Sequence, residues 1–147
     1  AKGMRYLHGL NIVHRDLKPA TVLLGDHFQV KISDFGLSAL GSEGMVDNEV
    51  GSLRWMAPER LQHKRYGKPS DVYSFGIIAW QILTLKTPYE QYNTPEEIQN
   101  AVAVRSERPP LTEDISLPAS LLCRCWHKRA FLRPKFNSIV CALLACN

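Results

Sequence analysis

The chain has 147 residues, of which 45% are hydrophobic and 22% charged, so it can bury a substantial core and suits a single domain. Its net charge of +4 is mild, and its two basic clusters, residues 63–65 and 127–129, border predicted helices without interleaved aromatic residues, which favours solvated turns and no nucleic-acid partner. The longest apolar stretch, residues 72–85, is interrupted by polar residues and is shorter than the roughly 20 residues of a bilayer crossing, so we predict no membrane span.

The first predicted element is a helix over residues 3–10, because its apolar residues recur at helical spacing and Gly9 and Asn11 mark its end. The sequence enters this helix at Ala1 without the long apolar stretch and small-residue cleavage site of a secretory signal. We therefore expect the true start to lie upstream.

Two short strands are predicted next. Residues 22–24 indicate a buried strand, residues 25–27 a turn, and residues 28–32 a second strand in which apolar and polar residues alternate. This hairpin separates two acidic residues, Asp16 and Asp34. We expect it to bring both to the same edge of the small sheet.

The rest of the chain is predicted to be helical after one loop. Residues 37–56 contain three glycines and few apolar residues, which indicates a mobile loop. Residues 72–85 are apolar on nearly every face and predict a central helix buried all round, with Ser70 as its N-cap. Thr94, followed by Pro95 and Glu97, predicts another helix start.

Apolar spacing also predicts the inward faces of the later helices, and no repeat or linker suggests a second domain. The residues on these faces are Ile98, Ala101 and Val102; Leu121, Leu122, Cys125 and Trp126; and Phe136, Ile139, Val140, Leu143 and Leu144.

The four cysteines, Cys123, Cys125, Cys141 and Cys146, do not have the spacing of a metal site. Cys123 and Cys125 lie two apart on a predicted helix and point in different directions, whereas zinc pairs use C-x-x-C or wider spacings. We expect reduced thiols packed in the core of a cytoplasmic protein.

Three motifs follow one another along the chain: H-R-D-L-K-P-A-T at residues 14–21, D-F-G at residues 34–36 and A-P-E at residues 57–59. Their spacing leaves room for a hairpin and then a mobile loop. Together they resemble the catalytic half of a eukaryotic protein kinase over essentially all of residues 1–147. The resemblance implies an α+β, protein-kinase-like fold restricted to the C-terminal lobe, mostly helical with a small β-hairpin region.

What the resemblance implies for function is transfer of the γ-phosphate of ATP to a protein hydroxyl with Mg²⁺. The Lys18-Pro19 pair and Ser52 resemble serine/threonine kinases, and residues 53–59 and 71–76 most resemble the tyrosine-kinase-like group, which is largely serine/threonine-directed. The expected partners are a protein substrate and an N-terminal lobe. The Gly-rich loop, strand lysine and helix glutamate of that lobe are absent from this chain, so we expect the isolated fragment to be inactive.

By the same resemblance, Asp16 accepts the proton of the substrate hydroxyl and Lys18 steadies the transferring phosphoryl group. Asp34 is expected to hold the magnesium that bridges the phosphates, and Leu23 to pack beneath the adenine. Two acidic residues on fixed loops suit this chemistry.

Thr21 departs from the H-R-D-L-x-x-x-N pattern, in which Asn binds a second magnesium ion and fastens the loop. A hydroxyl is a legitimate magnesium ligand, but its shorter reach predicts that this metal is held through water. We therefore expect weakened chemistry. The alternative is a pseudokinase or a noncatalytic scaffold or interaction module.

Structural and regulatory roles follow from the resemblance as well. Arg15 is expected to pair with a phosphate on the mobile loop, with Ser38 and Ser42 as acceptors and Asp47 and Glu49 as unmodified substitutes. Asp71 resembles the acid that anchors the catalytic loop, although a helix-start charge fits equally well. The remaining residues with expected structural roles are His14 and Phe35 in the apolar stack between lobes, Gly36 beside them, and Glu59 paired with Arg133.

Overall fold

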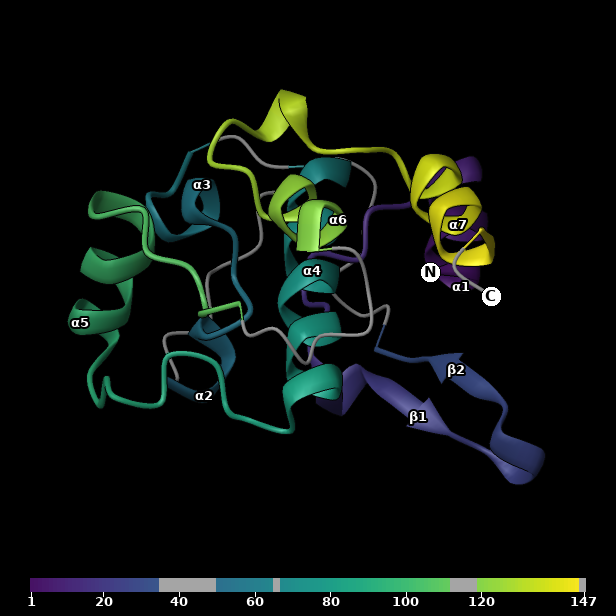
Figure 1. Cartoon of the computed structure of the whole chain (residues 1–147), viewed down its shortest axis with the longest axis horizontal. Helices are drawn as coiled ribbons and strands as arrows, with labels where there is room; N and C mark the ends of the chain where they lie inside the picture. Colours follow the sequence, from purple (N-terminus) through teal and green to yellow (C-terminus); the bar gives the residue numbers. More distant parts are fainter. Residues whose placement is uncertain (35–49, 65–66, 112–118, 146–147) are drawn as a thin grey trace.

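A long helix, α4 (Lys68–Thr84), runs through the middle of the molecule (Figure 1). The computed structural model describes residues 1–34, 50–64, 67–111 and 119–145. Helix α4 begins directly after Gly67, and Pro69 suits its first turn because the amide hydrogen that proline lacks has no partner there. Its side chains are buried on most faces up to Trp80, and the last turn reaches solvent.

The predicted central helix is therefore confirmed, but its predicted start is wrong, and so is its predicted burial all round, because Ile82 and Leu85 are exposed. Ser70 lies within the first turn and is not the N-cap, since the helix already begins at Lys68. The other elements surround α4. In chain order they are α1 (Lys2–Gly9), η1 (Pro19–Thr21), β1 (Val22–Leu24), η2 (Asp26–Phe28), β2 (Val30–Ile32), α2 (Val50–Leu53), α3 (Pro58–Leu61), α5 (Pro95–Gln99), the π-helical turn η4 (Asn100–Val104), α6 (Ala119–Cys125), η5 (Ala130–Leu132) and α7 (Phe136–Leu144).

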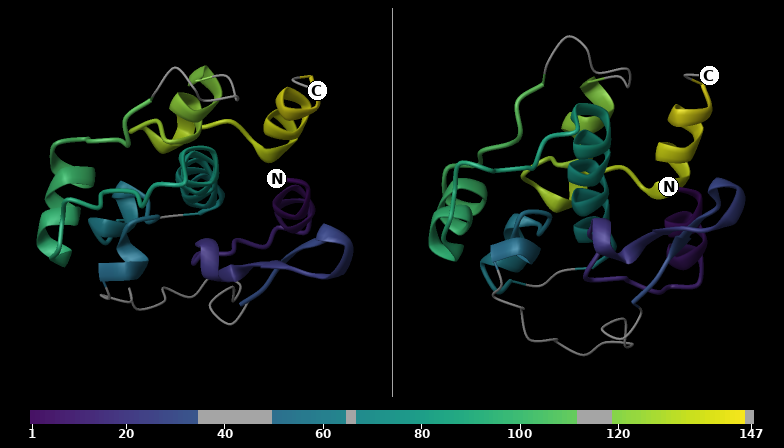
Figure 2. Two further views of the ribbon diagram at one scale, coloured as in Figure 1. Left: turned by 60° about the horizontal axis from the view of Figure 1, so that its bottom comes forward. Right: turned by 90° about the horizontal axis from the view of Figure 1, so that it is seen from below.

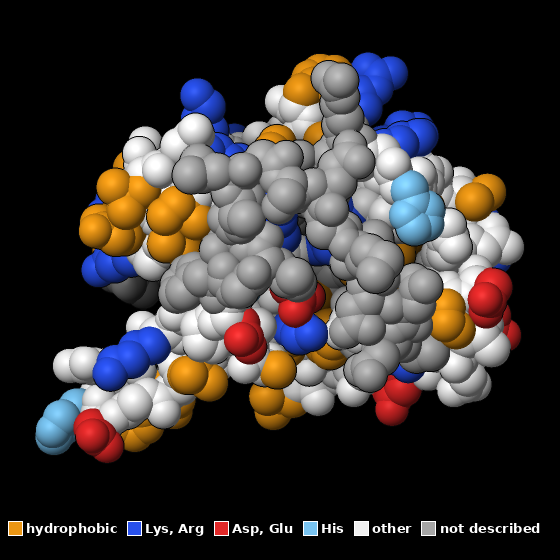
Figure 3. Space-filling model, turned by 180° about the vertical axis from the view of Figure 1, so that it is seen from behind, with side chains coloured by type: hydrophobic (Ala, Val, Ile, Leu, Met, Phe, Trp, Pro, Cys, Tyr) orange, Lys and Arg blue, Asp and Glu red, His pale blue; other side chains and the backbone are white. Residues whose placement is uncertain are grey.

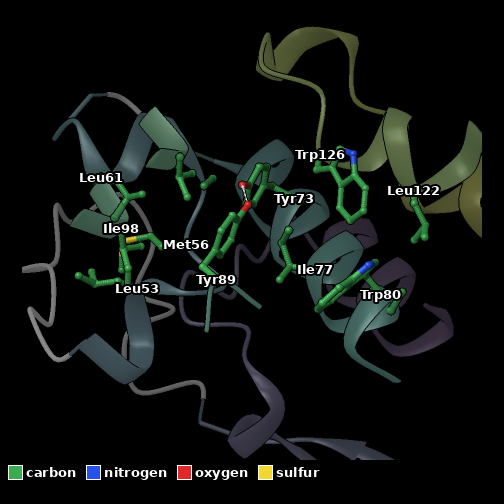
Figure 4. Close-up of a cluster of buried hydrophobic side chains, with 13 residues drawn as sticks. Leu53, Met56, Leu61, Tyr73, Ile77, Trp80, Tyr89, Ile98, Leu122 and Trp126 are labelled. Atoms are coloured by element: carbon green, nitrogen blue, oxygen red, sulfur yellow. Dashed lines mark hydrogen bonds between the residues drawn. The ribbon is translucent and has the colours of Figure 1, made fainter. Parts of the chain in front are cut away.

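One apolar cluster joins α4 to α2, α3, α5 and α6 (Figure 4). Tyr73 and Tyr89 point toward each other within it, and their hydroxyls are 3.2 Å apart. This contact gives both buried hydroxyls a hydrogen-bond partner, which burial in an apolar core requires. The cluster also includes Leu53, Met56, Leu61, Ile77, Trp80, Ile98, Val102, Leu122 and Trp126.

A second apolar cluster packs α1 and α7 side by side against α4 (Figures 1 and 2). The ring of Phe136 makes edge-on contacts with His8 at 5.0 Å and with Phe75 at 5.4 Å between centroids. Close approach of α4 to α6 depends on Gly76, because a Cβ there would lie 2.8 Å from the Cβ of Cys125. The predicted inward faces of the helices are confirmed except at Leu144, which is exposed on the last turn of α7.

Strands β1 and β2 form the predicted antiparallel hairpin, with Val22 opposite Ile32 and Leu24 opposite Val30. The hairpin projects away from the helices as an arm (Figures 1 and 3). Burial of β1 was predicted wrongly: Leu23 is 49% and Leu24 66% exposed, because no second layer of described residues covers their outer side. Phe28 belongs to the turn η2 and is 86% exposed, so the second strand is shorter than predicted.

Residues 50–56 also differ from the prediction of a mobile loop, since α2 occupies residues 50–53 and Leu53 and Met56 enter the core. The remainder of that predicted loop, residues 37–49, lies outside the described residues. None of the described helices combines the length and apolar character needed to cross a bilayer.

The cysteine prediction holds only in part. Cys125 is a buried thiol, and burial raises its pKa to about 12. Cys123 and Cys141 are exposed free thiols, because they lie on the outer faces of α6 and α7. Within the described ranges, no three His, Cys, Asp or Glu side chains form a group that could hold a metal ion.

Candidate active site

The site is built on Asp71, in the first turn of α4, whose side chain is only 1% exposed. One carboxylate oxygen accepts the backbone N–H of Arg15 at 2.9 Å, and the other accepts that of His14 at 2.8 Å. His8 of α1 donates its Nε2 hydrogen to the second oxygen at 2.8 Å. Hydrogen bonds to an ionised acceptor are about twice as strong as neutral ones. Asp71 therefore fixes the segment that leads into Asp16.

The backbone itself is unusual at two residues of the site. Arg15 has φ = 73° and Asp34 has φ = 62°, in the left-handed region that non-glycine residues seldom adopt. Such conformations cost on the order of 1–3 kcal/mol and persist where surrounding contacts hold them. For Arg15, the hydrogen bond from its N–H to Asp71 is one such contact.

Lys18 contacts two other predicted site residues, Asp16 from its own loop and Ser52 from a separate segment. Its ammonium lies 2.8 Å from Oδ2 of Asp16 and 3.0 Å from the hydroxyl of Ser52 in α2. The side chains of Asp16 and Lys18 are each 21% exposed, so the pair is partly shielded but accessible. The arrangement holds a carboxylate and a cation side by side at the protein surface.

Thr21 lies beneath this pair and is completely buried. Its hydroxyl donates toward the carbonyl oxygens of Lys18, at 2.9 Å, and Asp16, at 3.3 Å, and it accepts the N–H of Lys18 at 3.2 Å. The side chain therefore closes the loop of residues 16–21 on itself. Because the hydroxyl is fully buried and already bonded to backbone on both sides, it does not fit as a metal ligand in this arrangement.

The end of β2 returns to the same loop. The N–H of Ser33 donates to the carbonyl oxygen of Thr21 at 2.9 Å, and Nε2 of the buried His14 donates to the carbonyl oxygen of Ser33 at 2.8 Å. The next residue, Asp34, is exposed. An exposed carboxylate beside a fixed backbone suits Mg²⁺, which prefers oxygen ligands and keeps several waters.

The predicted pairing of Glu59 with Arg133 is a two-pronged contact at 2.6 and 2.8 Å. Ser70 donates to the same carboxylate at 2.8 Å, and Arg133 also donates to the carbonyl oxygen of Pro69. Burial raises the pKa of Glu59, but the hydrogen bonds and charge of Arg133 outweigh it, so the net pKa lies below the usual 4.5. The pair joins α3, α4 and the segment before α7.

Four residues of the expected site, Phe35, Gly36, Ser38 and Ser42, lie outside the described residues. Leu23 is described and stands exposed on β1. Sequence reasoning missed His8 and Arg54. Arg54 donates to the carbonyl oxygens of Pro88, Tyr89 and Tyr92 and so ties the segment after α2 to the one after α4. No sequence signal marks such contacts, because their acceptors are backbone groups.

Comparison with known proteins points to one family. The family described as protein tyrosine and serine/threonine kinase matches residues 1–143. The serine/threonine/tyrosine-protein kinase HT1 of Arabidopsis thaliana is 42% identical over 145 residues, covering 97% of this chain and 37% of that protein. The serine/threonine-protein kinase STY17 of the same organism is 41% identical, covering 95% and 25%. The dual specificity protein kinase shkC of Dictyostelium discoideum is 40% identical, covering 97% and 30%.

The chain thus spans between 25% and 37% of the length of these three relatives.

Replacing Asp71 with Asn is expected to lower the free energy of unfolding by about 2–4 kcal/mol, because the amide offers one acceptor oxygen where two backbone donors need one each. Amide hydrogen exchange at His14 and Arg15 should accelerate more than exchange in α5. The matched control is Asp26→Asn, in the exposed hairpin turn, which should change stability by less than about 0.5 kcal/mol. Unchanged exchange at both amides would show that Asp71 does not anchor the loop.

Arg133→Met is expected to cost about 3–5 kcal/mol, since it leaves the Glu59 carboxylate buried without its partner. Because the folded pKa of Glu59 is lowered, the stability it contributes is complete above pH 4.5 and is lost as the pH falls through the lowered folded value. Urea unfolding at neutral and acidic pH should therefore show a smaller acid loss for Glu59→Gln than for the unmodified chain. The control is Glu96→Gln at an exposed position, which should lose as much stability in acid as the unmodified chain. Equal acid losses for Glu59→Gln and the unmodified chain would contradict the lowered pKa of Glu59.

Proposed function

Because the chain belongs to the protein tyrosine and serine/threonine kinase family, we propose that it is the large lobe of a kinase domain that transfers the γ-phosphate of ATP to a protein hydroxyl. The observation that carries the proposal is the meeting of Asp16, Lys18 and Ser52 at one accessible point on a braced loop. Phosphoryl transfer depends mainly on positioning and charge stabilisation, which this arrangement can supply.

In the proposed reaction, Asp16 accepts the proton of the substrate hydroxyl as the hydroxyl oxygen bonds to the γ-phosphorus. The bond from the γ-phosphorus to the bridging oxygen breaks, and ADP leaves with that oxygen. The ammonium of Lys18, held by Asp16 and Ser52, lies where it can stabilise negative charge on the transferring group. Asp71 acts on this chemistry only through the backbone that positions Asp16.

The described residues fit one magnesium ion better than two. Asp34 is exposed, and the residue before it, Ser33, is held by backbone and side-chain hydrogen bonds to Thr21 and His14. The carboxylate of Asp34 would therefore hold the metal. Magnesium bound there supplies positive charge that neutralises the phosphates. Thr21, which was expected to contribute to a second metal site, instead braces the loop with its buried hydroxyl.

We propose serine and threonine as the acceptors, on the basis of the contact between Lys18 and Ser52 that the serine/threonine resemblance leads one to expect. Two of the relatives named above are described as serine/threonine/tyrosine or dual specificity kinases. Tyrosine is therefore an acceptor that the activity measurement must include.

The hairpin supports a further part of the proposal, that a strand-rich small lobe completes the nucleotide site. The hairpin exposes apolar side chains on both faces, because Leu23 lies on one face and the cross-strand pair Leu24 and Val30 on the other. Such a lobe would cover the face that carries Leu23, beneath the adenine. The exposed free thiols of Cys123 and Cys141 suit a reducing compartment, and we place the protein in the cytoplasm on that basis.

A noncatalytic scaffold is the second candidate, and the buried hydroxyl of Thr21 favours it because a second metal ligand is not offered. The two candidates differ in one measurable property. Only the kinase transfers phosphate when both lobes are present.

The decisive measurement is phosphate transfer to serine and tyrosine peptides by a chain extended upstream to carry the small lobe. Asp34→Asn should abolish transfer, because an amide cannot replace the charge that holds the metal, and Asp16→Asn should reduce it by on the order of 10²-fold or more. Asp26→Asn, an exposed substitution of the same kind, should have no effect. Absence of transfer by the unmodified chain would leave the scaffold as the function.

Substitutions at Thr21 separate its bracing role from metal binding. Thr21→Val keeps the shape but removes the hydroxyl, and we expect turnover to fall about fivefold, equivalent to roughly 1 kcal/mol, with no change in the magnesium requirement. Thr21→Asn should brace the loop and add an amide oxygen, so turnover should rise and the magnesium requirement fall. Thr21→Ser is the control that retains the hydroxyl. If Thr21→Val raised the magnesium requirement, the hydroxyl would be a metal ligand after all.

A further inference from the structure

A pocket of about 400 Å³ lies between α3, the turn η4 and the connection from α6 to η5. Its charged lining comes from Lys64, Arg108, Lys128, Arg129 and Glu59, and none of its lining residues belongs to the loop of residues 14–34. We call it the basic pocket. Because its lining lies outside residues 14–34, the basic pocket is separate from the proposed catalytic site.

The basic pocket brings together the two basic clusters that stood apart in the sequence. Lys64 comes from residues 63–65, and Lys128 and Arg129 come from residues 127–129. Taken separately, each cluster is explained as a solvated turn. Their convergence on one concave surface is a property of the fold, and it concentrates positive potential there.

These cations are exposed and available. Among the described residues, the side chains of Lys64, Lys128 and Arg129 make neither an ion pair nor a hydrogen bond. All three are exposed to solvent.

Glu59, the acidic residue among the described lining residues, does not cancel this charge. Glu59 is already bound by Arg133 through two hydrogen bonds and by Ser70 through a third. Its negative charge is thus balanced within the protein. An incoming anion would meet the remaining cations of the lining.

The walls of the basic pocket are held in place before any ligand arrives. Arg108 donates to the carbonyl oxygens of Val102 and Trp126, which come from η4 and the end of α6, and its guanidinium lies 5.0 Å from the ring centroid of Tyr73. Gln62 donates to the carbonyl oxygen of Ala103 at 3.1 Å and links α3 to η4. A preorganised site loses less free energy to ordering when it binds.

We propose that the basic pocket docks an acidic segment of a partner protein that carries two or more Asp or Glu side chains. Cations on separate walls can each bind a different carboxylate along an extended peptide. The pocket opens to solvent, so these side chains can enter it without the peptide passing through a channel. Among the described residues, those that line the pocket include no aromatic side chain on which a base could stack, so a nucleic acid is the poorer match.

The test is fluorescence anisotropy of a labelled peptide of alternating Glu and Gly, titrated with the 147-residue chain. We expect binding that weakens as salt rises from about 50 to about 300 mM, and no binding of the Gln-Gly counterpart. The triple variant Lys64→Gln, Lys128→Gln and Arg129→Gln should weaken binding by about tenfold or more. Circular dichroism and thermal unfolding establish that each variant is folded.

The matched control is Lys2→Gln, Lys31→Gln and Lys86→Gln, which removes the same charge from exposed positions outside the basic pocket. It should change the affinity less than about twofold. Equal losses in the two triple variants would reduce the effect to net charge and overturn the proposal. So would binding of a phosphoserine-Gly peptide, of a single-stranded oligonucleotide or of the Gln-Gly peptide in preference to the Glu-Gly peptide.

A charge-reversed variant, Lys64→Glu, Lys128→Glu and Arg129→Glu, keeps the proposal testable if the neutral variant unfolds. It should no longer bind the Glu-Gly peptide and should instead bind a labelled peptide of alternating Lys and Gly. Failure of a folded charge-reversed variant to lose the acidic peptide would place that peptide elsewhere. Phosphate transfer is measured separately, so this outcome does not bear on the catalytic proposal.

Discussion

The buried carboxylate of Asp71 is the contact on which the site depends. It receives hydrogen bonds from His8 in α1 and from two consecutive backbone amides, of His14 and Arg15, at 2.8 to 2.9 Å. Its place in the first turn of α4 adds the favourable end of the helix dipole. A buried charge with these partners is stable, and without them it would be costly. The same requirement fixes the loop relative to the central helix.

The two ion pairs of the site differ in how far they are exposed to solvent. Asp16 and Lys18 are partly exposed, so their attraction adds little to stability and both groups remain accessible from solvent. Glu59 and Arg133 are shielded, and Arg133 also touches the ring of Tyr73 at 5.1 Å from its centroid. A shielded pair of this kind constrains where its elements lie more than it stabilises them. It also leaves the neighbouring basic pocket with its positive charge.

Thr21 shows how a residue other than Asn can hold this loop together. Its hydroxyl satisfies backbone groups of residues 16 and 18, which an apolar residue would leave without partners. The hydroxyl is fully occupied by that task. The residue type alone allows two roles, brace and metal ligand, and the burial of the hydroxyl supports the first.

The sequence by itself determined the first helix, predicted at residues 3–10 and found at residues 2–9. It also determined the hairpin, the capped start of α5 and the order of the three motifs, because these depend on local spacing, capping and turn chemistry. It also paired Glu59 with Arg133, but only through a family resemblance. Only the tertiary structure decided that Leu23 and Leu24 are exposed, that residues 50–53 are helical, that His8 binds Asp71, and that Lys64 meets Lys128 in one pocket. Each of these depends on contacts between segments far apart in the chain, and local pattern carries no information about such contacts.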